Sequence, residues 1–108
     1  MSYVVNDFDE NEHTFKTLPN ALKFAYFQLT AFMRKWTHQE LETRVVSYGN
    51  GGYTGTYVAR IRYKGSLFTY YRTKKGDAYK VTPSGKLTAL TLTEKQIIFK
   101  VENNPKNW

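Results

Sequence analysis

Alternation of apolar and polar residues with a period of two, running from Thr43 to Thr82, most constrains how this chain can fold. Such alternation is typical of β-strands, because successive side chains point to opposite faces of a sheet. It predicts antiparallel strands over residues 43–48, 56–64, 67–74 and 78–82. Gly65-Ser66 and Gly76-Asp77 are expected to form two-residue hairpin turns, since glycine supplies the positive φ that such turns require.

The first of these turns also predicts a register. With Gly65-Ser66 as the loop, the cross-strand pairs are Tyr63 with Phe68, Arg62 with Thr69, Ile61 with Tyr70, and Arg60 with Tyr71. One face is then mostly apolar and should be the core; it carries Tyr57, Ala59, Ile61, Tyr63, Phe68, Tyr70, Tyr79 and Val81. The other face should remain accessible and carries Arg60, Arg62, Lys64, Thr69, Tyr71, Thr73 and Lys80.

A helical period precedes the strands. Apolar residues recur at alternating steps of three and four, which predicts a helix over residues 17–37 with Thr17 as its N-cap. The residues of this stripe are Leu22, Ala25, Leu29, Phe32 and Trp36, and the stripe is broadened by Phe24, Tyr26, Phe27 and Met33. The extra apolar surface leaves open a homodimer that packs through this first helix.

The two ends of the chain complete the expected fold. Short strands at 3–6 and 13–16 around an acidic turn predict an N-terminal hairpin within residues 1–16. Thr93 followed by Gln96 resembles a capping box and predicts a short helix over 93–103. A chain of 108 residues fits one domain. The expected fold is therefore α+β: a single twisted antiparallel sheet, with the long helix across its apolar face and a short C-terminal helix.

Composition narrows the class of protein. Hydrophobic residues make up 41% of the chain, which is enough apolar surface to exclude a disordered polymer. There are 0 cysteines, and the start of the chain lacks the basic and apolar regions of a secretory signal, so we expect a cytoplasmic protein. The polar residues inside the long helix, among them Lys23, Arg34 and Lys35, argue against a membrane span.

Positive charge is concentrated in the second half. Residues 1–53 carry five Lys or Arg against six Asp or Glu, a net charge of −1, whereas residues 54–108 carry eleven against three, a net charge of +8. Between Tyr53 and Lys80 the cations alternate with aromatic residues, a combination that suits phosphates and exposed bases. We therefore expect a small basic accessory protein that binds single-stranded or duplex nucleic acid through the accessible sheet face. Its contacts would be Arg60, Arg62, Lys64, Tyr71, Lys74, Lys75 and Lys80.

Two other interpretations of the basic face remain open. In one, it is a solvated exterior; in the other, it docks on an acidic protein as part of a protein-protein interaction module. The small size and the abundance of lysine, asparagine and tyrosine would suit an inhibitor or regulator from a phage or another mobile element. Such a protein would act on an acidic face of a host protein or nucleic-acid enzyme.

Candidate motifs for catalysis or metal binding are incomplete in this sequence. Asp7, Asp9 and Asn11 resemble the opening of a calcium loop, but Glu12 and Leu18 occupy the places where that loop needs glycine and glutamate. His13 and His38 are not at metal-ligand spacing. The sequence predicts no catalytic residue, no metal and no cofactor, and hence no enzyme. Separately, Gly49, Asn50, Gly51 and Gly52 form a glycine-rich connection whose backbone amides are a candidate anion site; a plain hairpin loop is the alternative.

The order helix, three antiparallel strands, helix is similar to that of double-stranded-RNA-binding domains. The Lys-Lys-x-Ala-Lys start of that family's second helix is missing, and Lys74-Lys75-Gly76-Asp77-Ala78 falls in an expected hairpin instead. The sequence therefore identifies no family.

Overall fold

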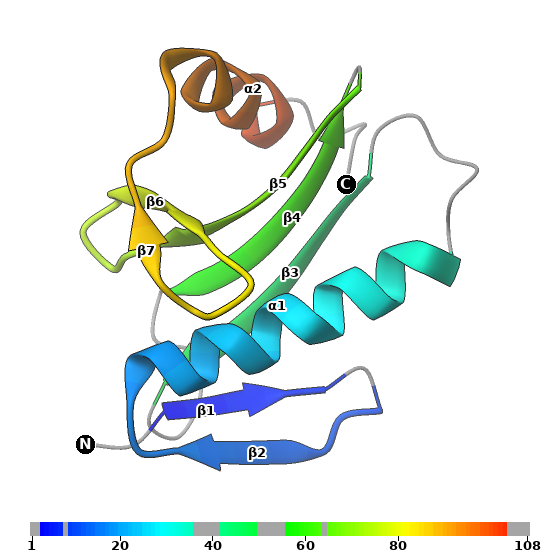
Figure 1. The fold of residues 1–108 in the computed structure, drawn as a ribbon, viewed down its shortest axis with the longest axis vertical. Coiled ribbons are helices and arrows are strands. Elements are labelled where there is room, and N and C mark those ends of the chain that lie inside the picture. Colours follow the sequence, from blue (N-terminus) through cyan, green and yellow to red (C-terminus); the bar gives the residue numbers. More distant parts are fainter. Residues whose placement is uncertain (1–2, 8, 36–41, 50–55, 64, 104–108) are drawn as a thin grey trace.

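A computed structural model describes residues 3–7, 9–35, 42–49, 56–63 and 65–103 of the chain, and for residues 32–35 and 42–49 it describes the backbone alone. Along this part the elements are β1 (Tyr3–Asn6), β2 (Glu12–Phe15), α1 (Leu18–Lys35), β3 (Glu42–Gly49), β4 (Tyr57–Tyr63), β5 (Ser66–Arg72), β6 (Ala78–Val81), β7 (Leu87–Thr88) and α2 (Leu92–Glu102). Neighbouring strands are all antiparallel and follow the order β2-β1-β3-β4-β5-β6-β7 (Figure 1). The predicted α+β class is confirmed.

The N-terminal hairpin and the first helix form close to where the sequence predicts them. The carboxylate of Asp7 shapes the hairpin turn, since its Oδ1 accepts the backbone N–H groups of Asp9 and Asn11, each at 2.9 Å. Thr17 precedes α1, and its carbonyl accepts the first helical bond, from Ala21 N–H at 3.2 Å. Within the described part of the chain, neither helix has the length and apolar character needed to cross a bilayer.

Both faces of the central strands are buried, contrary to the prediction of one accessible face. Neighbouring residues of β4 point in opposite directions, and Val58 packs with α1 whereas Ala59 packs with α2. The first cluster joins Val5, Ala21, Leu22, Ala25, Leu29, Val58, Tyr71 and Val81. The second joins Ala59, Ile61, Phe68, Tyr70, Leu90, Ile97, Ile98 and Val101. The long helix thus covers the face expected to be open, and the short helix covers the predicted core face (Figure 1).

The pairing in the β4–β5 hairpin explains why side chains of these two strands lie on the faces predicted for them. In the β4–β5 hairpin Tyr63 pairs with Ser66 and not with Phe68, so the predicted pairs are wrong by two residues. A shift by an even number returns each side chain to the same face. Ile61, Phe68 and Tyr70 are therefore buried as expected, although Tyr57 and Tyr63 are only half-buried.

The β5–β6 hairpin has a three-residue loop, Lys74-Lys75-Gly76, instead of the predicted two-residue turn. Gly76 N–H donates to Thr73 O at 3.0 Å and Thr73 N–H donates to Asp77 O at 2.8 Å. This odd change in loop length turns β6 over. Tyr79 consequently lies opposite Tyr71, on the α1 face, and Lys80 lies opposite Tyr70, on the α2 face.

The second helix begins two residues earlier than expected, since its capping box is formed by Thr91 and Glu94 and not by Thr93 and Gln96. Thr91 Oγ1 accepts Glu94 N–H at 3.1 Å, and Glu94 Oε1 accepts Thr91 N–H at 2.9 Å. Ile97, Ile98 and Val101 are buried and dock α2 on the sheet.

Candidate binding groove between the β5–β6 turn and α2

The residues predicted to bind a ligand through the open sheet face do not form such a surface. Arg60 and Tyr71 are each only 8% exposed, because α1 lies over them. Arg60 Nη1 donates to Thr69 Oγ1 at 2.9 Å, and the guanidinium carbon lies 5.1 Å from the ring centroid of Tyr26 on α1. The predicted accessibility of Arg60 and Tyr71 is therefore wrong.

The remaining predicted contacts are spread over different surroundings. Arg62 is half-buried, and Lys80 forms an ion pair with Glu94 at 2.9 Å. Lys74 and Lys75 are exposed in the β5–β6 turn. Lys64 lies outside the described residues, and so do Asn50, Gly51 and Gly52 of the glycine-rich connection, whose first residue, Gly49, ends β3.

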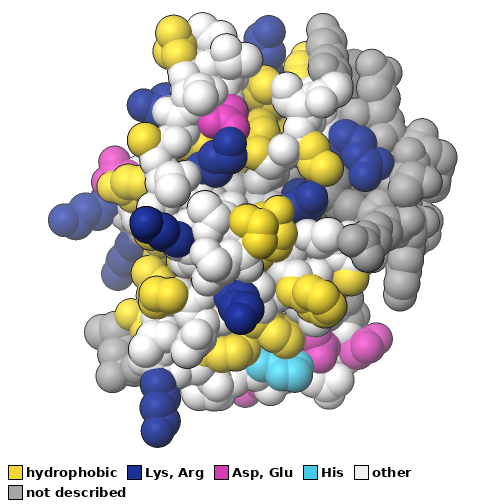
Figure 2. Space-filling model, viewed as in Figure 1, with side chains coloured by type: hydrophobic (Ala, Val, Ile, Leu, Met, Phe, Trp, Pro, Cys, Tyr) yellow, Lys and Arg dark blue, Asp and Glu magenta, His cyan; other side chains and the backbone are white. Residues whose placement is uncertain are grey.

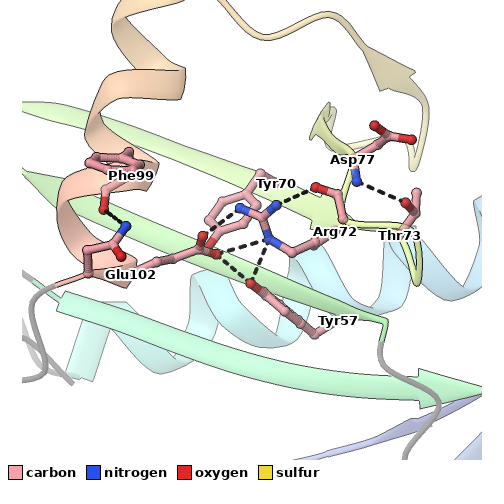
Figure 3. Close-up of polar contacts among 9 residues, drawn as sticks. Tyr57, Tyr70, Arg72, Thr73, Asp77, Phe99 and Glu102 are labelled. Carbon is pink, nitrogen blue, oxygen red and sulfur yellow. Dashed lines mark hydrogen bonds and ion pairs between the residues drawn. The ribbon is translucent and has the colours of Figure 1, made fainter.

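A charged network instead joins the β5–β6 hairpin to the last turn of α2 (Figure 3). Arg72 binds the carboxylate of Glu102 through two nitrogens, with Nη2 2.6 Å from Oε1 and Nε 3.1 Å from Oε2. Its Nη1 donates to Gly76 O at 2.6 Å, within the turn. The hydroxyls of Tyr57 and Tyr70 both donate to Glu102 Oε2. One carboxylate therefore ties two strands and one turn to α2.

Burial and the charge of Glu102 shift the pKa values of the groups in this network. Removal from water raises the pKa of Tyr70, and the negative charge of Glu102 raises it further. Burial also raises the pKa of Tyr57, and the hydrogen bond to Glu102 and the charge of that carboxylate raise it further. For Arg72 burial acts in the opposite direction, but the hydrogen bond to Tyr57 and the charge of Glu102 outweigh it and raise its pKa. Arg72 is hence a cation already matched by Glu102, and its charge is held inside the fold.

The network forms one wall of an open hollow of about 570 Å³ between the turn and α2. The turn side contributes Arg72, Gly76 and Asp77, and the helix side contributes Lys95, Phe99 and Glu102. A second hollow, of about 450 Å³, lies across α2 and is bordered by Lys95, Gln96, Phe99 and Lys100. Phe99 and Lys95 therefore stand between two concave surfaces; we call these surfaces, with the turn, the α2 groove.

The exposed side of α2 is both apolar and cationic. Leu92 is 73% exposed and Phe99, seven residues later on the same side of the helix, is 69% exposed. Lys95 and Lys100 are exposed beside them. On the face seen in Figure 2, Lys and Arg side chains are interspersed with hydrophobic ones and form no continuous patch.

Sequence reasoning assigned no role to Lys95, Phe99 and Lys100, although a signal for them was present. Once Ile97, Ile98 and Val101 are placed inward, Phe99 falls on the opposite side of the same helix. An aromatic residue on the solvent side of an amphipathic helix is a candidate contact residue.

Among the described residues, no cluster of three or more His, Asp or Glu side chains is arranged to hold a metal ion. The chain matches no protein-family model, no curated protein and no solved structure.

Proposed function

We propose that the protein is a non-enzymatic accessory protein of the cytoplasm that binds single-stranded nucleic acid in the α2 groove. The observation that carries this proposal is the exposed ring of Phe99, which lies between two hollows that share Lys95. An accessible aromatic ring flanked by lysines is what a strand with unpaired bases requires, because bases stack on the ring while phosphates meet the cations.

The cations of the groove come from two elements. Lys74 and Lys75 belong to the β5–β6 turn, and Lys95 and Lys100 belong to α2. Arg72 is neutralised by Glu102, so the lysines supply the attraction for phosphate. Asp77 is an acidic residue at the rim of the α2 groove. Its charge would repel the phosphates of a nucleic-acid strand and so direct them toward the lysines.

Salt dependence tests the phosphate contacts. Affinity for a single-stranded oligonucleotide should fall linearly with salt on a log-log plot, and Lys95→Ala should reduce that slope by about 0.7, the value for one lost phosphate contact. Lys86→Ala is the matched control, because Lys86 is an exposed lysine in the β6–β7 turn, outside the groove. Equal effects of the two substitutions, or no binding at low salt, would refute the proposal.

Stacking is tested separately with Phe99→Ala. This change should weaken binding by about 1 to 3 kcal/mol and leave the salt slope unchanged, since stacking releases no counterion. Folding should be unaffected, because the ring is mostly outside the core. A change in slope without a loss of affinity at low salt would contradict the assigned role of Phe99.

A second candidate function rests on Leu92. An exposed leucine cannot stack on a base as an aromatic ring does, and together with Phe99 it forms an apolar stripe edged by lysines. Such a stripe suits an acidic protein surface, as an inhibitor or regulator from a mobile element would use. Under this alternative, Leu92→Ser would abolish capture of the protein partner, whereas nucleic-acid binding would be absent at all salt concentrations.

A further inference from the structure

Strand β2 ends the order of strands, and β1 is its one strand neighbour among the described residues. The bond from Asp7 N–H to Asn11 O, at 3.0 Å, closes the β1–β2 ladder. Hydrogen-bonded and non-hydrogen-bonded pairs alternate along an antiparallel ladder, so His13 and Phe15 point their backbone groups at β1. The backbone groups of Glu12 and Thr14 therefore point away from the sheet and can pair with another strand.

The sequence along this edge is complementary to itself. If two copies of β2 pair in antiparallel fashion about Thr14, Glu12 of one copy lies opposite Lys16, the residue directly after β2, of the other, and this pair occurs twice. The side chains of Glu12, Thr14 and Lys16 are all exposed. Like charges on an edge strand normally prevent such pairing, whereas here the opposed charges favour it.

An apolar hollow of about 430 Å³ borders the same edge on the side that faces α1. It is lined by Phe15, Asn20, Lys23, Phe24 and Phe27, and Phe27 is 67% exposed. Phe24 also contacts His13, with the ring centroids 4.5 Å apart. Pairing about Thr14 would place His13 of one copy against Phe15 of the other on this side, next to the two hollows.

We propose that the protein forms a homodimer in which two copies of β2 pair antiparallel about Thr14 and the two Phe27-lined hollows cover one another. The partner is a second copy of this chain, because the same short edge carries both members of the charge pair. This interface lies apart from the α2 groove and does not depend on what the groove binds.

Exchanging the charges at Glu12 and Lys16 tests the register of the proposed β2–β2 pairing. Wild-type protein should show a concentration-dependent monomer–dimer equilibrium in analytical ultracentrifugation. Glu12→Lys and Lys16→Glu should each raise the dimer Kd by about tenfold, since each places two like pairs across the interface. The double substitution should restore the wild-type Kd to within about threefold. Lys86→Glu makes the same change in net charge as Lys16→Glu, away from the edge, and should leave the Kd unchanged.

Thr14→Pro tests the backbone pairing. Its missing N–H is one that points away from β1, so the β1–β2 ladder survives while the dimer is lost. Circular dichroism establishes that the variant is folded, and the exposed charge variants test the interface independently of it. A strictly monomeric wild-type protein would overturn the proposal. So would a dimer unaffected by Glu12→Lys, or a double substitution that dimerises no better than the single ones.

Discussion

At the scale of single residues, Arg60 shows how a cation can belong to the core. Its guanidinium is held by Thr69 Oγ1 and the ring of Tyr26, while its Nε is buried without a hydrogen-bond partner in the described structure. The aliphatic stem of arginine packs as an apolar side chain does. Sequence alternation cannot separate such a residue from a solvated arginine, because both occupy the same period-two positions.

We expect Arg60→Ala to lower the free energy of unfolding by about 2 to 4 kcal/mol, the range for truncating a large buried side chain. Urea unfolding at constant m-value measures this loss. Lys86→Ala, an exposed change, should stay within about 0.5 kcal/mol of wild type. Equal urea midpoints for the two variants would show that Arg60 is not a core residue. A loss of nucleic-acid binding in Arg60→Ala would accordingly report unfolding and not a lost contact.

The Tyr70 hydroxyl should make the folded protein less stable at alkaline pH. Burial and the nearby Glu102 raise the pKa of Tyr70 above its ordinary value of 10.0, so the folded state keeps a proton that the unfolded state releases. A raised folded-state pKa contributes stability that is complete below the unfolded-state pKa and is lost as pH rises above it.

The free energy of unfolding should therefore fall between about pH 9 and about pH 11, and it should fall less steeply in Tyr70→Phe, which has no proton to retain. Urea unfolding of both proteins across this range makes the comparison, and the other tyrosines contribute equally to each. Identical slopes would mean that the Tyr70 hydroxyl is not protected in the folded state.

At the scale of elements, the hairpins show where sequence reasoning succeeds and where it stops. The alternation located every strand from β3 to β6 to within two residues, and Thr17 marked the start of α1. Glycine marked the turns but did not fix how many residues each loop holds, because Gly65 and Gly76 adopt positive φ in loops of different length. One residue of loop length decides the face of the next strand, which is why Lys80 lies on the α2 face, opposite to the prediction.

Two glycines in similar turns should differ in tolerance to alanine. Gly76 has φ +98° with nothing within 4 Å of an added Cβ, whereas Gly85 has φ +88° and the added Cβ would lie 2.1 Å from Pro19 O of α1. Gly76→Ala should cost about 1 to 2 kcal/mol from backbone strain alone. Gly85→Ala should cost about 3 kcal/mol or more, because the helix backbone must also move. Thermal or urea unfolding compares them, and equal losses would show that α1 does not press on the β6–β7 turn.

At the scale of the whole molecule, the two helices pack on opposite faces of the sheet. Each covers one face of β4 and β5, so the described side chains of these two strands form no open basic face. The sequence located the excess of positive charge in the second half of the chain but could not assign it to a surface. Which cations are matched depends on contacts between residues far apart in sequence, such as Arg72 with Glu102. Four exposed lysines, Lys74 and Lys75 on the β5–β6 turn and Lys95 and Lys100 on α2, lie around the α2 groove, and we propose that binding occurs there.

The most direct test of this placement is a titration of isotopically labelled protein with a single-stranded oligonucleotide, followed through backbone amide chemical shifts. We expect fast, saturable shifts at residues 73–77 of the β5–β6 turn and 92–103 of α2, and none along β2 or the exposed side of α1. Shifts confined to β2 and α1, or an unchanged spectrum at low salt, would contradict it.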